Sequence, residues 1–265
     1  MSGDDARPSW ITRDRLITGS AIVLASALAW WWLTASDMGM DGDGMDHMSS
    51  MGGMMASMPW TPAYAFSVFL MWAIMMVAMM LPSAAPMILL YARVAGNQGT
   101  AATLPPTFVF AGAYVAAWML FSALATTAQW AMTASGLLTD AMRLNSQGLG
   151  GALLIGAGLF QLTPLKRICL AHCRSPIAFL TQHWRPGFWG ALRMGVHHGT
   201  YCIGCCWFIM ALLFVGGVMN LIWVVAIAAF VMAEKLLPAG ERIGQAAGVL
   251  AVAIGGYLLL TPFLT

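Results

Sequence analysis

Seven apolar blocks, each about as long as a bilayer is thick, divide the sequence. A helix needs about 20 residues to cross the hydrocarbon core. Only 8% of the 265 residues are charged, too few to cover a soluble domain of this size. Lipid admits helices or closed barrels, and the blocks lack the apolar–polar alternation of barrel strands. The sequence therefore predicts an all-α fold, a polytopic membrane helix bundle with about seven transmembrane helices, at residues 16–35, 62–90, 106–130, 148–165, 197–216, 218–237 and 243–262.

The first block has two interpretations. Arg7, Arg13 and Arg15 precede it, as basic residues precede the apolar part of a cleaved signal peptide. Its length and the tryptophans at 30–32 favour instead a retained helix with an aromatic belt at the membrane interface. We expect the helix to be retained, which gives seven spans, whereas cleavage would leave six.

The basic residues predict how the chain is oriented. If residues 1–15 form a cytoplasmic tail and the spans alternate, eleven of the twelve Lys and Arg residues face the cytoplasm, and Arg143 is the exception. The chain then divides into this tail, the first helix at 16–35, an outward-facing loop at 36–60 and a metal-binding helix bundle at 61–265. The net charge of +2 is small and the basic residues lie at helix ends, so nucleic-acid binding is not expected.

The loop at 36–60 combines methionine with aspartate and has no Lys or Arg. Thioethers are soft donors that select Cu(I), while Asp and His side chains also suit Cu(II). The alternative is a flexible low-complexity linker, since Gly and Ser are plentiful. We expect this loop to capture metal ions on the outer side of the membrane, because repeated apolar side chains give a linker in water no advantage. The residues concerned are Met38, Met40, Met45, His47, Met48, Met51, Met54, Met55 and Met58.

The second span carries five methionines at helical spacing, Met71, Met75, Met76, Met79 and Met80. A face of thioethers across the bilayer would pass a soft cation along by ligand exchange. Methionine is equally an adaptable packing residue, so an ordinary core is the alternative. Pro82 and Pro86 each free a backbone carbonyl, which membranes tolerate mainly where neighbours or a cavity satisfy it. With the other sulfur-rich segments, this pattern favours a conduit.

All five cysteines lie in one short stretch near the predicted cytoplasmic side. With three of the four histidines there they form the candidate set Cys169, His172, Cys173, His197, His198, Cys202, Cys205 and Cys206. If 198–206 is helical, His198, Cys202, Cys205 and Cys206 share one face. A reducing compartment disfavours structural disulfides, and such a set suits metal binding or thiol exchange. Soft sulfur ligands favour Cu(I), with zinc as the weaker candidate. The plain alternative is that buried cysteines act as small hydrophobic residues.

Glu234 is the one carboxylate near a membrane interior, and an ionisable group there is a functional candidate by default. The expected partner is Lys235 or an arginine of the 166–193 segment. A role in gating and a structural ion pair at the interface are both open for Glu234 and Lys235.

Several spaced motifs lie in order between residues 60 and 262. They are Met71-Trp72…Met75…Ala78-Met79-Met80…Pro82-Ser83…Pro86-Met87, Thr163-Pro164-Leu165-Lys166…Cys169…Cys173-Arg174…Pro176, His198-Gly199…Cys202…Gly204-Cys205-Cys206-Trp207, Gly217…Met219-Asn220-Leu221…Trp223 and Glu234-Lys235…Pro238…Gly240. Together they resemble the signature of a bacterial family of predicted metal-binding integral membrane proteins, in which one relative is a copper chaperone for a tyrosinase. The resemblance implies metal handling in the bacterial inner membrane and leaves the reaction, the direction of transport and the partner open.

The sequence therefore predicts a copper(I)-binding membrane protein that acts in copper transport or as a copper chaperone for cuproenzyme maturation. Its expected partners are the lipid bilayer, a copper donor or acceptor protein and a cuproenzyme, and a homo-oligomer is a further expectation. No catalytic residue is assigned. Two alternatives stay open: a membrane thiol–disulfide oxidoreductase and a metal-bearing subunit of a larger membrane complex.

Overall fold

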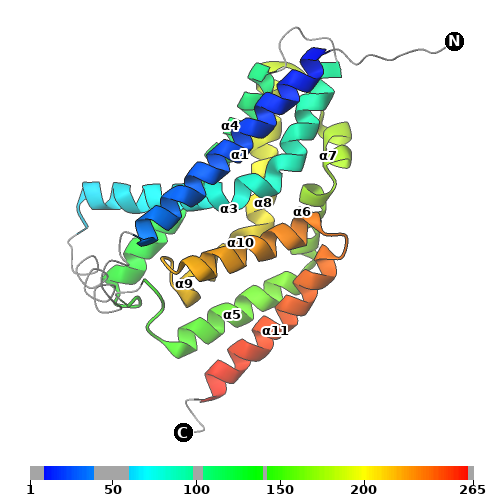
Figure 1. Ribbon diagram of the computed structural model, residues 1–265. Coiled ribbons are helices and arrows are strands. Elements are labelled where there is room, and N and C mark those ends of the chain that lie inside the picture. The colour runs from blue at the N-terminus through cyan, green and yellow to red at the C-terminus, as the bar shows by residue number, and fades with distance from the viewer. Residues whose placement is uncertain (1–8, 39–59, 98–103, 140–141, 262–265) are drawn as a thin grey trace, which may run out of the picture.

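A computed structural model describes residues 9–38, 60–97, 104–139 and 142–261 (Figure 1). Outside the helices this part of the chain has only short connections and one isolated bridge, between Leu138 and Leu144. The predicted all-α membrane bundle is confirmed. The helices are α1 (Ser9–Met38), α3 (Pro62–Asn97), α4 (Leu104–Ala134), α5 (Gln147–Leu162), α6 (Pro164–Arg174), α7 (Pro176–His183), α8 (Gly187–Ala211), α9 (Leu213–Gly216), α10 (Leu221–Leu236) and α11 (Gly240–Leu260).

All seven predicted blocks are helical, but they do not all qualify as full membrane crossings. Among the described residues, five helices are long and apolar enough to cross, and the bent pair α5–α6 makes a sixth if it is one span. The block at 148–165 is cut at Thr163, which caps α6 ahead of Pro164, and the two helices meet at 65°. α10 has 16 residues, fewer than a crossing needs. α8 starts at Gly187, ten residues before the predicted span at 197–216.

The helices pack in two groups that α10 connects. α3 packs against α1 and α4, and α4 packs against α8, while α5 and α11 form a close pair (Figure 1). α10 contacts α3, α6 and α11, and α6 lies along α8. Because α3, α6, α8 and α10 meet in this way, side chains from segments far apart in the sequence reach one interior region.

Small residues allow α5 and α11 to approach closely. A side-chain carbon at Gly158 would lie 2.5 Å from the carbonyl oxygen of Gly248, and one at Gly151 would lie 2.9 Å from that of Gly255. In membranes such glycines bring helix backbones into contact. The pair therefore forms a closely packed unit next to α6 and α10.

α3 has 36 residues and changes direction partway along its length (Figure 1). Proline cannot donate to the carbonyl four residues earlier, so Pro82 leaves the carbonyl of Ala78 without its helical partner. The indole of Trp30 on α1 donates to this oxygen at 3.0 Å. A neighbouring helix thus satisfies the freed carbonyl, and α1 is built into the bundle at this contact.

Candidate metal centre

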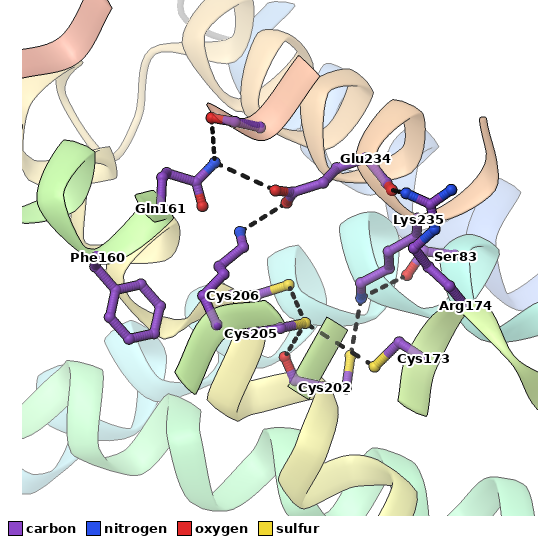
Figure 2. Close-up of polar contacts among 12 residues, drawn as sticks. Ser83, Phe160, Gln161, Cys173, Arg174, Cys202, Cys205, Cys206, Glu234 and Lys235 are labelled. Atoms are coloured by element: carbon purple, nitrogen blue, oxygen red, sulfur yellow. Dashed lines mark hydrogen bonds and ion pairs between the residues drawn. The ribbon is translucent and has the colours of Figure 1, made fainter. Parts of the chain in front are cut away.

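Four thiols from two helices meet in the interior of the bundle. Cys202, Cys205 and Cys206 on α8 are at most 1% exposed, and Cys173 on α6 is half-buried. The Sγ atom of Cys205 lies 3.2 Å from that of Cys206 and 3.9 Å from that of Cys173 (Figure 2). The expected helix over 198–206 is present, and its turns bring Cys202 next to the other two. All five cysteines of the chain are free thiols.

Cys169 is placed differently from the other four. It is buried on α6 and faces Gly204 of α8, where a side-chain carbon would come within 3.0 Å of its Sγ atom. Glycine at this position leaves room for the sulfur between the two helices. Cys173, one turn further along α6, is the residue that reaches Cys205.

Lys235 of α10 extends into the thiol cluster. Its Nζ atom lies 2.9 Å from the Sγ of Cys202 and 3.2 Å from the Oγ of Ser83 (Figure 2). The Sδ of Met80 lies 4.0 Å from the same nitrogen. The hydroxyl of Tyr114 lies 3.2 Å from the same Cys202 sulfur. A buried ammonium is stabilised by a nearby anion, and the Cys202 sulfur is the group in position to be one. The cluster therefore places a soft sulfur donor beside a basic side chain.

Glu234 points away from the thiols. Its carboxylate accepts from the Nζ of Lys166 at 2.7 Å and from the side-chain amide of Gln161 at 3.3 Å (Figure 2). Both members of the ion pair are almost fully buried. The predicted partner, Lys235 or an arginine, was wrong, because successive helical residues point about 100° apart. Arg174 instead binds the backbone carbonyl of Glu234 at 3.3 Å.

The five methionines of the α3 face are all buried in the core, with exposed fractions of at most 8%. Their burial is compatible with packing and with a conduit. The contact between Met80 and Lys235 places one end of this face beside the thiols, and the Met80 carbonyl also accepts from Tyr114 at 3.1 Å.

Most of the predicted outer capture loop lies outside the described residues. Met38 ends α1. The other members of the set, Met40, Met45, His47, Met48, Met51, Met54, Met55 and Met58, fall within 39–59.

The histidines divide between two places. His198 is buried one turn before Cys202, stacks on Tyr114, and its Nδ1 has no partner among the described residues. His172 and His197 lie apart from the thiols, next to His183 of α7. The sequence pattern did not point to His183 as a member of this histidine group or to Lys166 as the partner of Glu234. Both residues acquire their neighbours through packing between helices.

In the part of the chain that the structure describes, no three His, Cys, Asp or Glu side chains form a ready-made metal site. Copper(I) needs few ligands and prefers sulfur, so the distance between two thiol sulfurs is compared with the distance that two ligands of one ion require. Sulfurs that bind one three-coordinate ion at about 2.3 Å each lie about 4 Å apart. The separation of 3.9 Å between Cys173 and Cys205 fits this value. Cys173 and Cys205 are therefore spaced as two ligands of one soft monovalent ion, and Cys202 and Met80 lie close by around Lys235.

The fold and this region define a class: an all-helical membrane protein with a buried, thiol-rich centre beside a lysine. The family model described as "PpoB2: Copper chaperone" matches residues 69–258, and the chain belongs to this family. No curated protein and no solved structure matches the chain. The match runs from α3 to α11 and includes every cysteine, and the family implies that copper is the metal.

Proposed function

We propose that this protein is a membrane copper chaperone that holds Cu(I) at Cys173, Cys202 and Cys205 and passes it to a cuproenzyme. The observation that carries the proposal is the convergence of free thiols from α6 and α8 in the core of a copper-chaperone family member. Thiolates and thioethers are the ligands that select Cu(I) over harder ions such as Zn(II). Cys206, 3.2 Å from Cys205, is a further thiol available for exchange.

Lys235 has a specific part in this proposal. It neutralises the Cys202 thiolate while the cluster is empty of cargo, and so keeps a nucleophilic sulfur in the membrane interior. An arriving Cu(I) displaces the ammonium from the sulfur, and one proton then leaves Lys235 or a second cysteine thiol. The release of this proton keeps the buried centre at the same net charge.

The route to the thiols follows the sequence expectations. The 36–60 loop collects copper on the outer side, and the α3 methionines relay it to Met80, which lies beside Lys235. Movement from exchangeable thioethers to thiolates is favourable, because thiolates bind more tightly. The N-terminal tail is cytoplasmic, and α1 is retained as part of the bundle in the bacterial inner membrane. The contact between Trp30 and Ala78 supports retention of α1.

The test is Cu(I) binding by protein purified anaerobically in detergent, with copper and zinc counted and ligands identified by X-ray absorption. The wild type should bind copper through sulfur, and a Cys202/Cys205/Cys206→Ser variant should lose the sulfur-ligated copper. Cys169→Ser is the matched control. This variant should retain copper, because Cys169 faces Gly204 and not the other thiols. A wild type without copper, or a triple variant that binds like the wild type, contradicts the proposal.

The same samples separate the proposed role from its alternatives. Stoichiometric zinc that is lost with the serines would assign a structural zinc site. Thiol alkylation followed by mass spectrometry would reveal a disulfide between the α6 and α8 cysteines, as an oxidoreductase requires. Free thiols in all isolated states, together with bound copper, support the chaperone.

A further inference from the structure

Three histidines from three helices meet close to, but apart from, the thiol cluster. The ring centres of His183 (α7) and His197 (α8) are 4.7 Å apart, and those of His172 (α6) and His183 are 6.4 Å apart. Tyr201 completes the group, stacked on His172 at 4.0 Å and near His197 at 4.8 Å. Imidazoles that bind one ion at about 2.0 Å have ring centres about 5 to 6 Å apart. The observed separations bracket this range.

The hydrogen bonds of two of these rings fix which nitrogen is free. The Nδ1 of His172 lies 2.8 Å from the carbonyl oxygen of Ile168, and the Nδ1 of His183 lies 3.1 Å from that of Phe179. A carbonyl only accepts, so in the neutral rings Nδ1 carries the proton and Nε2 keeps its lone pair. Metal-binding histidines are oriented by bonds of this kind. This observation is independent of the ring spacing.

A pocket of 370 Å³ gives access to the group. His183 and His197 line it, together with Met194, Arg185 and Arg193, and the Met194 sulfur accepts from the backbone N–H of Arg185 at 3.4 Å. Two cationic side chains in the same pocket penalise a divalent ion more than a monovalent one. The pocket therefore favours Cu(I), with nitrogen and thioether donors, over Zn(II) or Cu(II).

The group is connected to the thiols through α8. His197 is followed by the buried His198, which stacks on Tyr114 at 5.5 Å and lies one helical turn before Cys202. The hydroxyl of Tyr114 lies 3.2 Å from the Cys202 sulfur. His198, whose Nδ1 has no partner among the described residues, is thus next to His197 in sequence and is linked to the thiol cluster through Tyr114.

We propose that His172, His183 and His197 form a second Cu(I) site, a transfer station between the pocket and the thiol cluster. The inference rests on the proposed function for the identity of the metal, and on the histidine geometry for its position. His172 must rotate toward the other two rings when the ion binds, because its ring centre is 6.4 Å from that of His183. Exchange between neutral imidazoles and thiolates then moves the ion along α8 without an open path to water.

The test compares three proteins loaded anaerobically with Cu(I): the wild type, His183→Phe/His197→Phe, and Cys202/Cys205/Cys206→Ser. Phenylalanine keeps the ring packing and removes the donor nitrogens. The wild type should bind one copper ion more than either variant. The phenylalanine variant should keep only sulfur-ligated copper, and the serine variant only nitrogen-ligated copper. Tyr201→Phe is the matched control and should bind like the wild type.

The outcomes separate this inference from the proposed function. The second site alone is overturned if the wild type shows no nitrogen-ligated copper and the phenylalanine variant binds as much copper as the wild type. The proposed function is overturned if the wild type binds no sulfur-ligated copper. Retained sulfur-bound copper in the phenylalanine variant also shows that it folds. If it does not fold, carbethoxylation of the wild type decides: Cu(I) should protect His183 and His197, and equal modification with and without Cu(I) contradicts the site. Zinc that binds as tightly as copper would overturn the preference for a monovalent ion.

Discussion

Lys166 and Lys235 are both buried in the bundle, yet they face anions of different chemistry. Lys166 meets the carboxylate of Glu234 at 2.7 Å, and Gln161 binds the second oxygen of the same group. Lys235 meets the sulfur of Cys202 at 2.9 Å, with Ser83 and Met80 as its other neighbours. Adjacent residues of α10, Glu234 and Lys235, therefore belong to two separate polar groups (Figure 2).

The difference between the two groups is chemical. A carboxylate is a hard donor whose charge and hydrogen bonds are already satisfied by Lys166 and Gln161, so this group joins α5, α6 and α10. A thiolate is a soft ligand that can exchange an ammonium for Cu(I). We therefore interpret the carboxylate group as structural and the thiol group as the working centre.

Lys166→Met should have the largest effect on stability. It leaves the Glu234 carboxylate buried without its partner, a change that typically costs about 3–5 kcal/mol. The measurement is the unfolding free energy in detergent micelles. The double variant Lys166→Met/Glu234→Leu should recover most of the loss, because it removes both buried charges. No recovery in the double variant would show that the pair does more than join helices.

Lys235→Met should mainly affect copper. Residues that orient a metal ligand typically change metal affinity by about 10- to 100-fold when they are removed. We expect a weaker affinity for Cu(I) of that order and slower alkylation of Cys202, with a smaller stability loss than for Lys166→Met. Lys235→Arg, which keeps the charge, is the control and should retain most of the affinity. A Lys235→Met protein with unchanged copper affinity and a stability loss as large as for Lys166→Met would remove the distinction between the two groups.

The sequence predicted the parts of these groups that depend on local pattern. The apolar blocks predicted the helices, and the spacing of Cys202, Cys205 and Cys206 predicted their common face on α8. It could not distinguish Cys169 from Cys173, because both lie one turn apart on the same helix. Gly204 and the crossing of α6 over α8 decide which of them reaches Cys205.

The partners of the charged residues could also not be predicted from the sequence. Lys166 reaches Glu234 only because Pro164 turns the chain between α5 and α6 by 65°. His183 joins His197 through the placement of the short helix α7 against α8. In each case the deciding contact is between segments whose relative position no local pattern encodes.

Tyr114→Phe should have an intermediate effect and sharpens the comparison on the thiol side. The change removes one hydroxyl, which contacts both Cys202 and the Met80 carbonyl. Hydrogen bonds between membrane helices typically contribute about 0.6–2 kcal/mol. We expect a stability loss of about 1 kcal/mol and a copper affinity lowered less than in Lys235→Met. The Cu(I) affinity and the unfolding free energy, measured on the same preparations, test this order. An effect on affinity larger than that of Lys235→Met would mean that Tyr114, and not Lys235, is the main partner of the Cys202 sulfur.

Arg167→Ala provides the smallest effect and a reference for both buried groups. Arg167 lies 4.0 Å from Glu241, and both side chains are 53% exposed. Exposed ion pairs contribute about 0–1 kcal/mol, because water and salt screen the charges. We expect a change in unfolding free energy within about 0.5 kcal/mol and an unchanged affinity for Cu(I). Since Arg167 is next to Lys166 on α6, its small effect would show that burial and the partner, and not the helix itself, separate the two positions. A loss comparable to that of Lys166→Met would instead mean that α6 is sensitive to any change of charge, and the contrast between the two buried lysines would need another cause.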